Sequence, residues 1–129
     1  MDITWLGHAC FRLRSDDLVV VTDPFPPSLG LRPDPRPATV VTVSNTHPNH
    51  SHWQEVAGSA QLFTSPGEYE HSGVYVRGVM TALPPETPRE QRNVAYAINI
   101  GNVNICHLGD IAVPLTPRQI AEQSPVAVL

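Results

Sequence analysis

The apolar residues of this chain come in short runs rich in β-branched side chains, and turn residues separate the runs. Runs of about four to eight such residues are typical of β-strands, because an amphipathic helix needs a longer segment with apolar residues every three or four positions. The pattern predicts strands over residues 3–6, 10–14, 18–22, 40–44, 61–64, 74–81, 94–100, 103–107 and 126–129. It therefore favours a mostly β fold.

Few segments are predicted to be helical. Thr116, Pro117 and Gln119 resemble a capping box that opens a helix, and this helix should end near Gln123. A second short helix is expected over 52–57. Two loops complete the prediction: a segment with six prolines over 24–37, since proline donates no backbone hydrogen bond, and a surface loop over 83–91. The predicted fold class is α+β with one or two short helices.

Length and charge narrow the class of protein. A chain of 129 residues suits a single domain, 1–129. Its 8 basic and 12 acidic residues leave a net charge of -4, which argues against a nucleic-acid partner or an anionic membrane. No apolar run reaches the roughly 18 residues of a membrane span, and Met1 and Asp2 lack the basic start of a signal peptide, so we expect a cytoplasmic protein. Cys10 and Cys106 are expected to be buried free thiols.

Three histidines lie within six residues directly after the strand predicted over 40–44. His47, His50 and His52 can converge on one point at the strand end, and imidazole is the commonest metal ligand in proteins. A second strand, over 103–107, also runs into a loop that presents Asp110. The histidine spacing predicts a metal site, or descent from one.

Taken in order, five segments resemble the metallo-β-lactamase superfamily, specifically the small metal-dependent hydrolases that include ascorbate-6-phosphate lactonase-like proteins. The segments are residues 3–11, 21–25, the strand with its histidine loop over 41–52, 66–74, and 105–116. The resemblance covers essentially the whole chain. It implies an αββα sandwich of two similar halves with mostly antiparallel or mixed sheets, of which this chain would form the first half.

The same resemblance implies a metal loop of the form His-x-His-x-Asp-His. Here its four ligand positions read Asn45, His47, Asn49 and His50, so two of the four carry amides. Asp110 falls on the carboxylate that bridges the two metals in the family. The bridging position is therefore intact, whereas the loop is altered.

Further positions of the family site are either kept or absent. Asp23 matches a carboxylate that orients a ligand imidazole from behind, and His8 lies near the same ligands, although a buried structural histidine is an equally good interpretation of His8. Another metal-binding histidine of the family has no counterpart, since Leu83 and Pro84 occupy its place and no histidine lies between His71 and His107.

These changes make a two-metal hydrolytic centre unexpected, because a catalytic zinc takes about three protein ligands and an open water position. Two alternatives remain: one rearranged site that binds Zn²⁺ or Mn²⁺, or a chain that binds no metal. The ligands of the rearranged site would be His47, His50 and Asp110, with His52, Asn45 and Asn49 as additional donors.

The sequence leaves three hypotheses for the function. The first is a degenerate family member that acts as a binding or assembly module, the second a metal-dependent hydrolase of a small lactone or phosphodiester, and the third a truncated relic without activity. We expect weakened or lost catalysis. Because a first half alone would leave an apolar sheet face in water, we also expect a homodimer in which a second chain packs on that face. Glu68 and Glu70 are expected to be solvated carboxylates in a turn.

Overall fold

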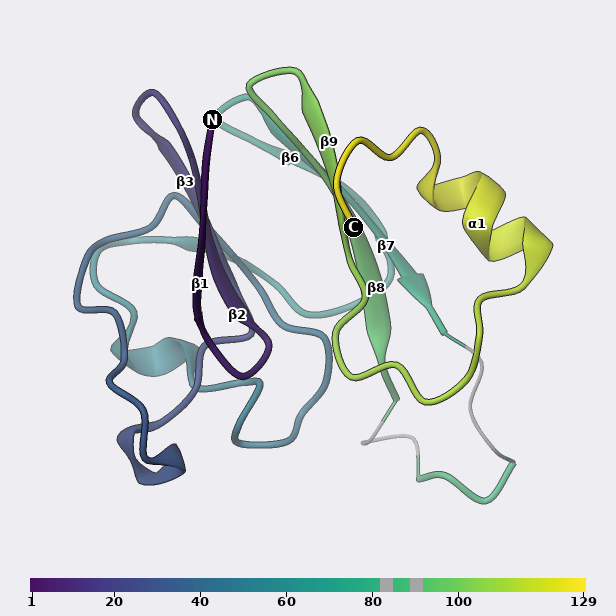
Figure 1. The fold of residues 1–129 in the computed structure, drawn as a ribbon, viewed down its shortest axis with the longest axis horizontal. Coiled ribbons are helices and arrows are strands. Elements are labelled where there is room, and N and C mark those ends of the chain that lie inside the picture. The colour runs from purple at the N-terminus through teal and green to yellow at the C-terminus, as the bar shows by residue number, and fades with distance from the viewer. Residues whose placement is uncertain (82–84, 89–91) are drawn as a thin grey trace.

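The computed structural model describes residues 1–81, 85–88 and 92–129 and contains two β-sheets that pack face to face (Figure 1). The first sheet has the order β1 (Asp2–Gly7), β2 (Cys10–Ser15), β3 (Leu18–Thr22), β4 (Val40–Thr42) and β5 (Gln61–Phe63). The second has the order β6 (Gly67–His71), β7 (Val74–Met80), β8 (Val94–Ile100) and β9 (Val103–His107). The predicted α+β fold, mostly strand, is confirmed.

The two sheets differ in strand direction. β1, β2 and β3 form an antiparallel meander, and β3, β4 and β5 then run parallel to one another. The second sheet is antiparallel throughout, and β8 and β9 are joined by the two-residue turn of Gly101 and Asn102, both with positive φ. Because β3 and β4 are parallel neighbours, their carboxyl ends lie at one edge of the first sheet.

The main core lies between the sheets. Leu13, Val20 and Val40 of the first sheet pack with Val76 and Ile98 of the second. A second apolar cluster covers the opposite face of the first sheet, where the proline-rich segment and two short 3₁₀ helices lie, η1 (Pro27–Leu29) and η2 (Trp53–Glu55). The first sheet is therefore covered on both faces.

The predicted helix is α1 (Pro117–Gln123). Its capping box is present: the Thr116 side chain accepts from the backbone of Gln119, and the Gln119 side chain accepts from the backbone of Thr116. Gln119 Nε2 also donates to the carbonyl oxygen of Met80 at 2.8 Å, which fastens the helix to β7. No helix within the described ranges is both long and apolar enough to cross a membrane.

Several sequence predictions need correction. The helix expected over 52–57 is only the three-residue η2. Glu68 and Glu70 are exposed as expected but lie, instead of in a turn, on β6, an edge strand whose alternating burial gives no apolar run. The strand expected over 126–129 is a single parallel bridge between Val128 and Ile105. The loop expected over 83–91 lies largely outside the described residues.

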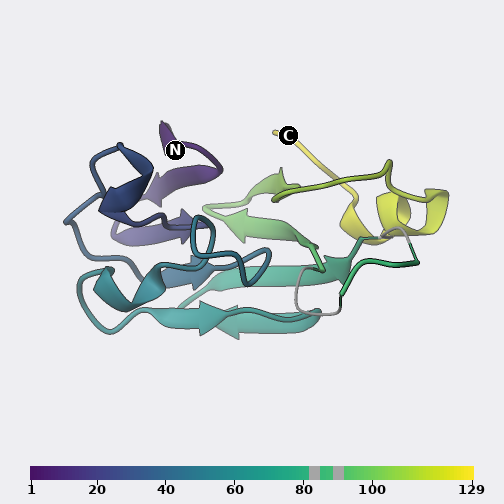
Figure 2. The same ribbon diagram turned by 90° about the horizontal axis from the view of Figure 1, so that it is seen from below.

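The second sheet covers the inner face of the first. The homodimer expected on an exposed sheet face stays a prediction. At one side of the sandwich, Ile3 and Leu13 line an apolar cavity of about 330 Å³ together with Ile105, Val128 and Leu129. Figure 2 shows β1 and the C-terminal segment on the same side of the molecule.

Candidate functional site

Asp23 stands where the parallel strands β3 and β4 end. β3 runs into Asp23 and β4 continues to Ser44, so the two residues meet at one edge of the sheet. Asp23 is fully buried. Its Oδ1 accepts a hydrogen bond from the Ser44 backbone N–H at 2.7 Å, and its Oδ2 accepts one from the Ser44 hydroxyl. Ser44 thus fixes both oxygens of this carboxylate.

His50 is the imidazole that Asp23 holds. His50 Nδ1 lies 2.8 Å from Asp23 Oδ2, and the residue is 5% exposed. Because Nδ1 faces the carboxylate, Nε2 is the nitrogen left to face outward, and it lies 4.0 Å from Asp110 Oδ2. A carboxylate behind an imidazole fixes the orientation of the ring. The structure brings these three residues together in the order that the resemblance implies.

Asp110 is carried by the loop after β9. Gly109 has a φ of +67°, and a Cβ at this position would lie 2.3 Å from Ser44 Cβ, so the close approach of the two loops requires glycine. The Asp110 N–H donates to Asn93 Oδ1 at 2.8 Å, and Asn93 Nδ2 donates to the Leu108 carbonyl at 2.7 Å. The Asp110 side chain is 71% exposed. Buried Asn93, which sequence reasoning missed, therefore positions this loop.

The histidine loop is closed by its own hydrogen bonds. Asn45 Oδ1 accepts from the His47 N–H at 2.9 Å, and His47 Nδ1 accepts from the Asn49 N–H at 3.1 Å. His47 is exposed, and its ring centroid lies 6.3 Å from that of His50. Asn45 Oδ1 and His47 Nδ1, two atoms that could otherwise bind a metal, are thus engaged within the loop.

An open cleft of about 390 Å³ lies beside His50. His8 enters it from the turn between β1 and β2, where it is exposed and has a φ of 51°. The His8 ring centroid lies 4.6 Å from that of His50. Phe11, His107 and Asp110 also line the cleft. His8 is therefore a surface residue of the site and not a buried structural histidine.

A metal ion does not fit these donors as they stand. Within residues 1–81, 85–88 and 92–129, no three side chains of His, Cys, Asp or Glu form a group that could hold one. The expected set of His47, His50 and Asp110 lies along one edge of the sheet, but the three side chains do not gather around a common point at the roughly 2.0 to 2.2 Å that zinc requires.

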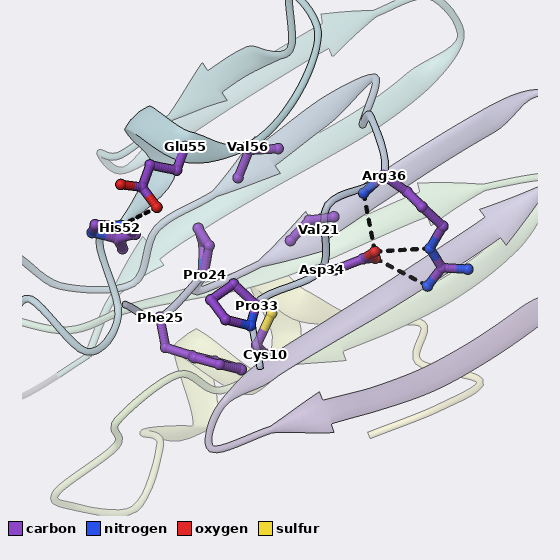
Figure 3. A pocket seen from close by; sticks show the side chains of 10 residues that line it. All are labelled: Cys10, Val21, Pro24, Phe25, Pro33, Asp34, Arg36, His52, Glu55 and Val56. Atoms are coloured by element: carbon purple, nitrogen blue, oxygen red, sulfur yellow. Dashed lines mark hydrogen bonds and ion pairs between the residues drawn. The ribbon is translucent and has the colours of Figure 1, made fainter. Parts of the chain in front are cut away.

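His52 lies in a different pocket, contrary to the expectation that it serves as an extra ligand. It lines a pocket of about 30 Å³ together with Cys10 and Phe25, beneath the proline-rich segment (Figure 3). His52 Nε2 lies 3.1 Å from Glu55 Oε2. The structure therefore separates His52 from the cleft of His50.

The same pocket contains a carboxylate between two arginines. Asp34 Oδ1 lies 2.8 Å from Arg36 Nε, and Asp34 Oδ2 lies 3.2 Å from Arg12 Nη1 (Figure 3 shows the Arg36 contacts). Burial alone would raise the pKa of Asp34, but the hydrogen bonds and charges of the two arginines outweigh it and lower the pKa. Burial, then the charges of Asp23 and Asp34, raise the pKa of Cys10 to about 12, so it stays a thiol. The contacts of Asp34 fasten the proline-rich segment over this pocket.

His107 is a further site residue that sequence reasoning missed. Its Nε2 lies 2.9 Å from the Ala9 carbonyl, and its Nδ1 is buried without a hydrogen-bond partner in the described part of the chain. Burial lowers the pKa of His107 and outweighs the opposing charge of Asp23, so the ring is neutral near pH 7. Its place at the end of a strand before Asp110 is the signal that could have pointed to it.

Comparison with known proteins bears on this geometry. A family model described as "Beta-lactamase superfamily domain" matches residues 2–129. A "UPF0173 metal-dependent hydrolase" from Methanoculleus marisnigri is 30% identical over 136 residues, which cover 87% of this chain and 59% of that protein.

Solved structures agree on the fold. A protein from Thermotoga maritima, assigned as a zinc-dependent hydrolase of the metallo-beta-lactamase superfamily, superposes with a TM-score of 0.77 at 35% identity, covering 96% of this chain and 57% of that one. A protein from Parabacteroides distasonis, assigned as a metal-dependent hydrolase, has a TM-score of 0.63 at 15% identity and supports the fold alone. The chain spans somewhat more than half the length of the two more similar relatives.

Proposed function

Because the chain belongs to the metallo-beta-lactamase-fold family of metal-dependent hydrolases, we propose that it is a degenerate member with weakened or lost hydrolysis. It keeps the fold and the oriented imidazole of His50. By itself it does not hold a divalent metal tightly enough to generate hydroxide, and it serves as a binding or assembly module.

The histidine loop is the observation that carries this proposal. Compared with the family pattern, Asn45 replaces an imidazole and Asn49 replaces a carboxylate, so the loop loses one strong donor and one negative charge. A neutral amide oxygen is a poor ligand for zinc. The Asn45 oxygen is, in addition, already accepting the His47 N–H. This engagement of the Asn45 oxygen within the loop supports the proposal.

What remains is a two-donor site. His50 Nε2 and the Asp110 carboxylate face one another across 4.0 Å, and Asp23 keeps the imidazole in one orientation. Two donors support weak and reversible binding of Zn²⁺ or Mn²⁺, with water in the other positions. A catalytic centre needs about one more protein ligand to lower the pKa of a bound water to roughly 7.

The cleft favours one alternative function. Its volume of about 390 Å³ lies within the range of small-molecule sites, and His8, His50 and Asp110 line it. A small lactone or phosphodiester could enter such a cleft, so an active hydrolase with a reduced metal site is the second candidate.

Metal content separates these two functions. Protein purified without an affinity tag and dialysed against metal-free buffer should retain less than about a tenth of a zinc or manganese ion per chain, since two donors exchange freely. It should also hydrolyse bis(p-nitrophenyl) phosphate at the rate of a metal-only control.

The matched variants decide which site any retained metal occupies. The proposal would be contradicted if the wild type retained about one ion per chain, if His50→Ala lost this ion and if His71→Ala kept it. If turnover accompanied that ion, the chain would be a metal-dependent hydrolase. His71 is the control because it lies on β6, outside the cleft.

A further inference from the structure

The cleft beside His50 carries negative charge. Two carboxylates flank the imidazole, Asp23 behind it and Asp110 in front of it. Among the described residues that line the cleft none is an arginine, and the chain contains no lysine. No guanidinium or ammonium group of the cleft therefore offsets the two carboxylates. A cleft of this charge attracts a cation and repels an anionic ligand.

Two hydrogen-bond acceptors in this cleft are held in place. The Asp23 carboxylate accepts the Nδ1 proton of His50, so Nε2 of the neutral ring carries a lone pair. The loop of Asp110 is fixed by Asn93, whose Oδ1 accepts the Asp110 N–H at 2.8 Å. His50 Nε2 and Asp110 Oδ2 are thus two oriented acceptors, and they stand 4.0 Å apart.

The distance between these two atoms suits a hydrogen-bonded nitrogen better than a metal ion. Two ligand atoms on a tetrahedral zinc ion, each about 2.1 Å from the metal, stand about 3.4 Å apart. Two acceptors that share one donor atom, each at about 2.8 Å from it, stand about 4.0 to 4.6 Å apart. The observed 4.0 Å therefore matches a single donor atom that bridges His50 and Asp110.

A protonated amine meets these requirements. A hydroxyl group has one proton and cannot donate to both acceptors, and water has two protons but no charge, whereas an ammonium group has both the donors and the charge. Ala9, Phe11 and Leu108 line the same cleft and offer an apolar wall to a hydrocarbon chain. We propose that the cleft binds a primary alkylammonium ion, whose nitrogen bridges His50 Nε2 and Asp110 Oδ2.

This inference rests on the proposed function, because it names the ligand class that the binding module takes when no metal is held. The ammonium nitrogen and a metal ion would use the same two atoms of His50 and Asp110, so the two cations compete. The amine is therefore tested in the presence of a chelator, and the metal content is measured separately.

Titration of the metal-free chain with n-butylamine tests the proposal. NMR chemical shifts of the His50 imidazole should change saturably, with a dissociation constant on the order of millimolar for so small a ligand. Two probes with the same hydrocarbon chain serve as controls. Uncharged n-butanol and anionic n-butyl phosphate should each bind at least about tenfold more weakly, because neither offers a cationic donor to the two acceptors.

Two matched variants locate the binding. Asp110→Asn should weaken n-butylamine binding at least about tenfold, because it removes the charge that faces the ammonium group. Asp17→Asn removes the same charge and should leave binding unchanged, since Asp17 is exposed in the turn between β2 and β3 and lies outside the cleft. Circular dichroism checks that both variants fold.

Three results would overturn the proposal: no saturable shift with n-butylamine, binding of n-butyl phosphate as tight as that of the amine, or an equal loss of affinity in the two variants. Zinc that the wild type retains after dialysis against metal-free buffer would instead contradict the proposed function. The two failures are distinguishable, because the chelator removes the metal before the amine is added.

Discussion

Asp23 contributes more to the order of the site than any of the histidines does. It is fully buried, adopts a φ of 39° that few non-glycine residues tolerate, and accepts hydrogen bonds from Ser44 and His50. Strained backbone at a buried carboxylate persists where the surroundings stabilise it strongly. Here that support comes from the parallel strand ends of β3 and β4.

Asp23→Asn should therefore destabilise the fold even without a metal. The substitution removes the charge that faces His50 and places an amide donor against donors, which costs about 2 kcal/mol of unfolding free energy. Urea unfolding measures the change, with Asp17→Asn as the control because Asp17 is exposed. Equal stability of the two variants would show that Asp23 does not hold the loop.

Buried His107 should make the free energy of unfolding depend on pH. Burial lowers the pKa of its folded-state imidazole below the ordinary 6.5, so its contribution is complete above pH 6.5. As the pH falls below 6.5, the unfolded chain binds the proton first, and stability decreases by about 1.4 kcal/mol per pH unit until the folded-state pKa is reached. Unfolding of the wild type at pH 7.5 and 5.5 should show this loss, and His107→Gln should reduce it. An identical loss in the variant would exclude His107 as the cause.

Sequence patterns identify some site residues and miss others for a physical reason. Asp23, His50 and Asp110 stand at strand ends within segments that resemble a known family, so their approach could be expected. Asn93 and His107 act through contacts between segments far apart in the chain, His107 with Ala9 and Asn93 with the loop of Asp110. Such contacts depend on sheet packing, which no local pattern encodes.

At the level of elements, apolar runs located the buried strands well. β-branched runs coincide with β3, β7, β8 and β9, and the predicted capping box opens α1. β6 was missed because an edge strand buries little on either face and so carries charged residues, such as Glu68, which pairs with Arg77 at 3.0 Å. An apolar pattern therefore indicates a buried strand, and it misses a strand that is exposed.

Tyr96 links the two sheets and provides a test of their packing. Its buried hydroxyl, on β8, donates to the carbonyl oxygens of Val43 and Phe63 at 2.9 and 3.2 Å, at the ends of β4 and β5. Tyr96→Phe leaves both acceptors without this donor and should cost about 1 to 2 kcal/mol. Tyr75→Phe is the control, because Tyr75 is 58% exposed. Equal denaturation midpoints for the two variants would mean that the hydroxyl does not tie the sheets together.

At the scale of the whole molecule, the proposed function treats the fold and the site separately. The chain aligns over 96% of its length with a zinc-dependent hydrolase fold, yet its histidine loop carries amides at two positions. The sandwich depends on buried apolar contacts between the sheets, and none of these requires a metal. Ligand residues can therefore be replaced without loss of the fold, and a resemblance that predicts the architecture correctly does not by itself predict the reaction.

We propose that the two amides of the histidine loop weaken the binding of a metal by this chain. Restoring the family pattern with Asn45→His and Asn49→Asp tests it most directly, by zinc titration calorimetry of the double variant beside the wild type. We expect the double variant to bind zinc at least about tenfold more tightly, because each restored ligand strengthens coordination. Equal affinity in the two proteins, or tight binding by the wild type, would contradict it.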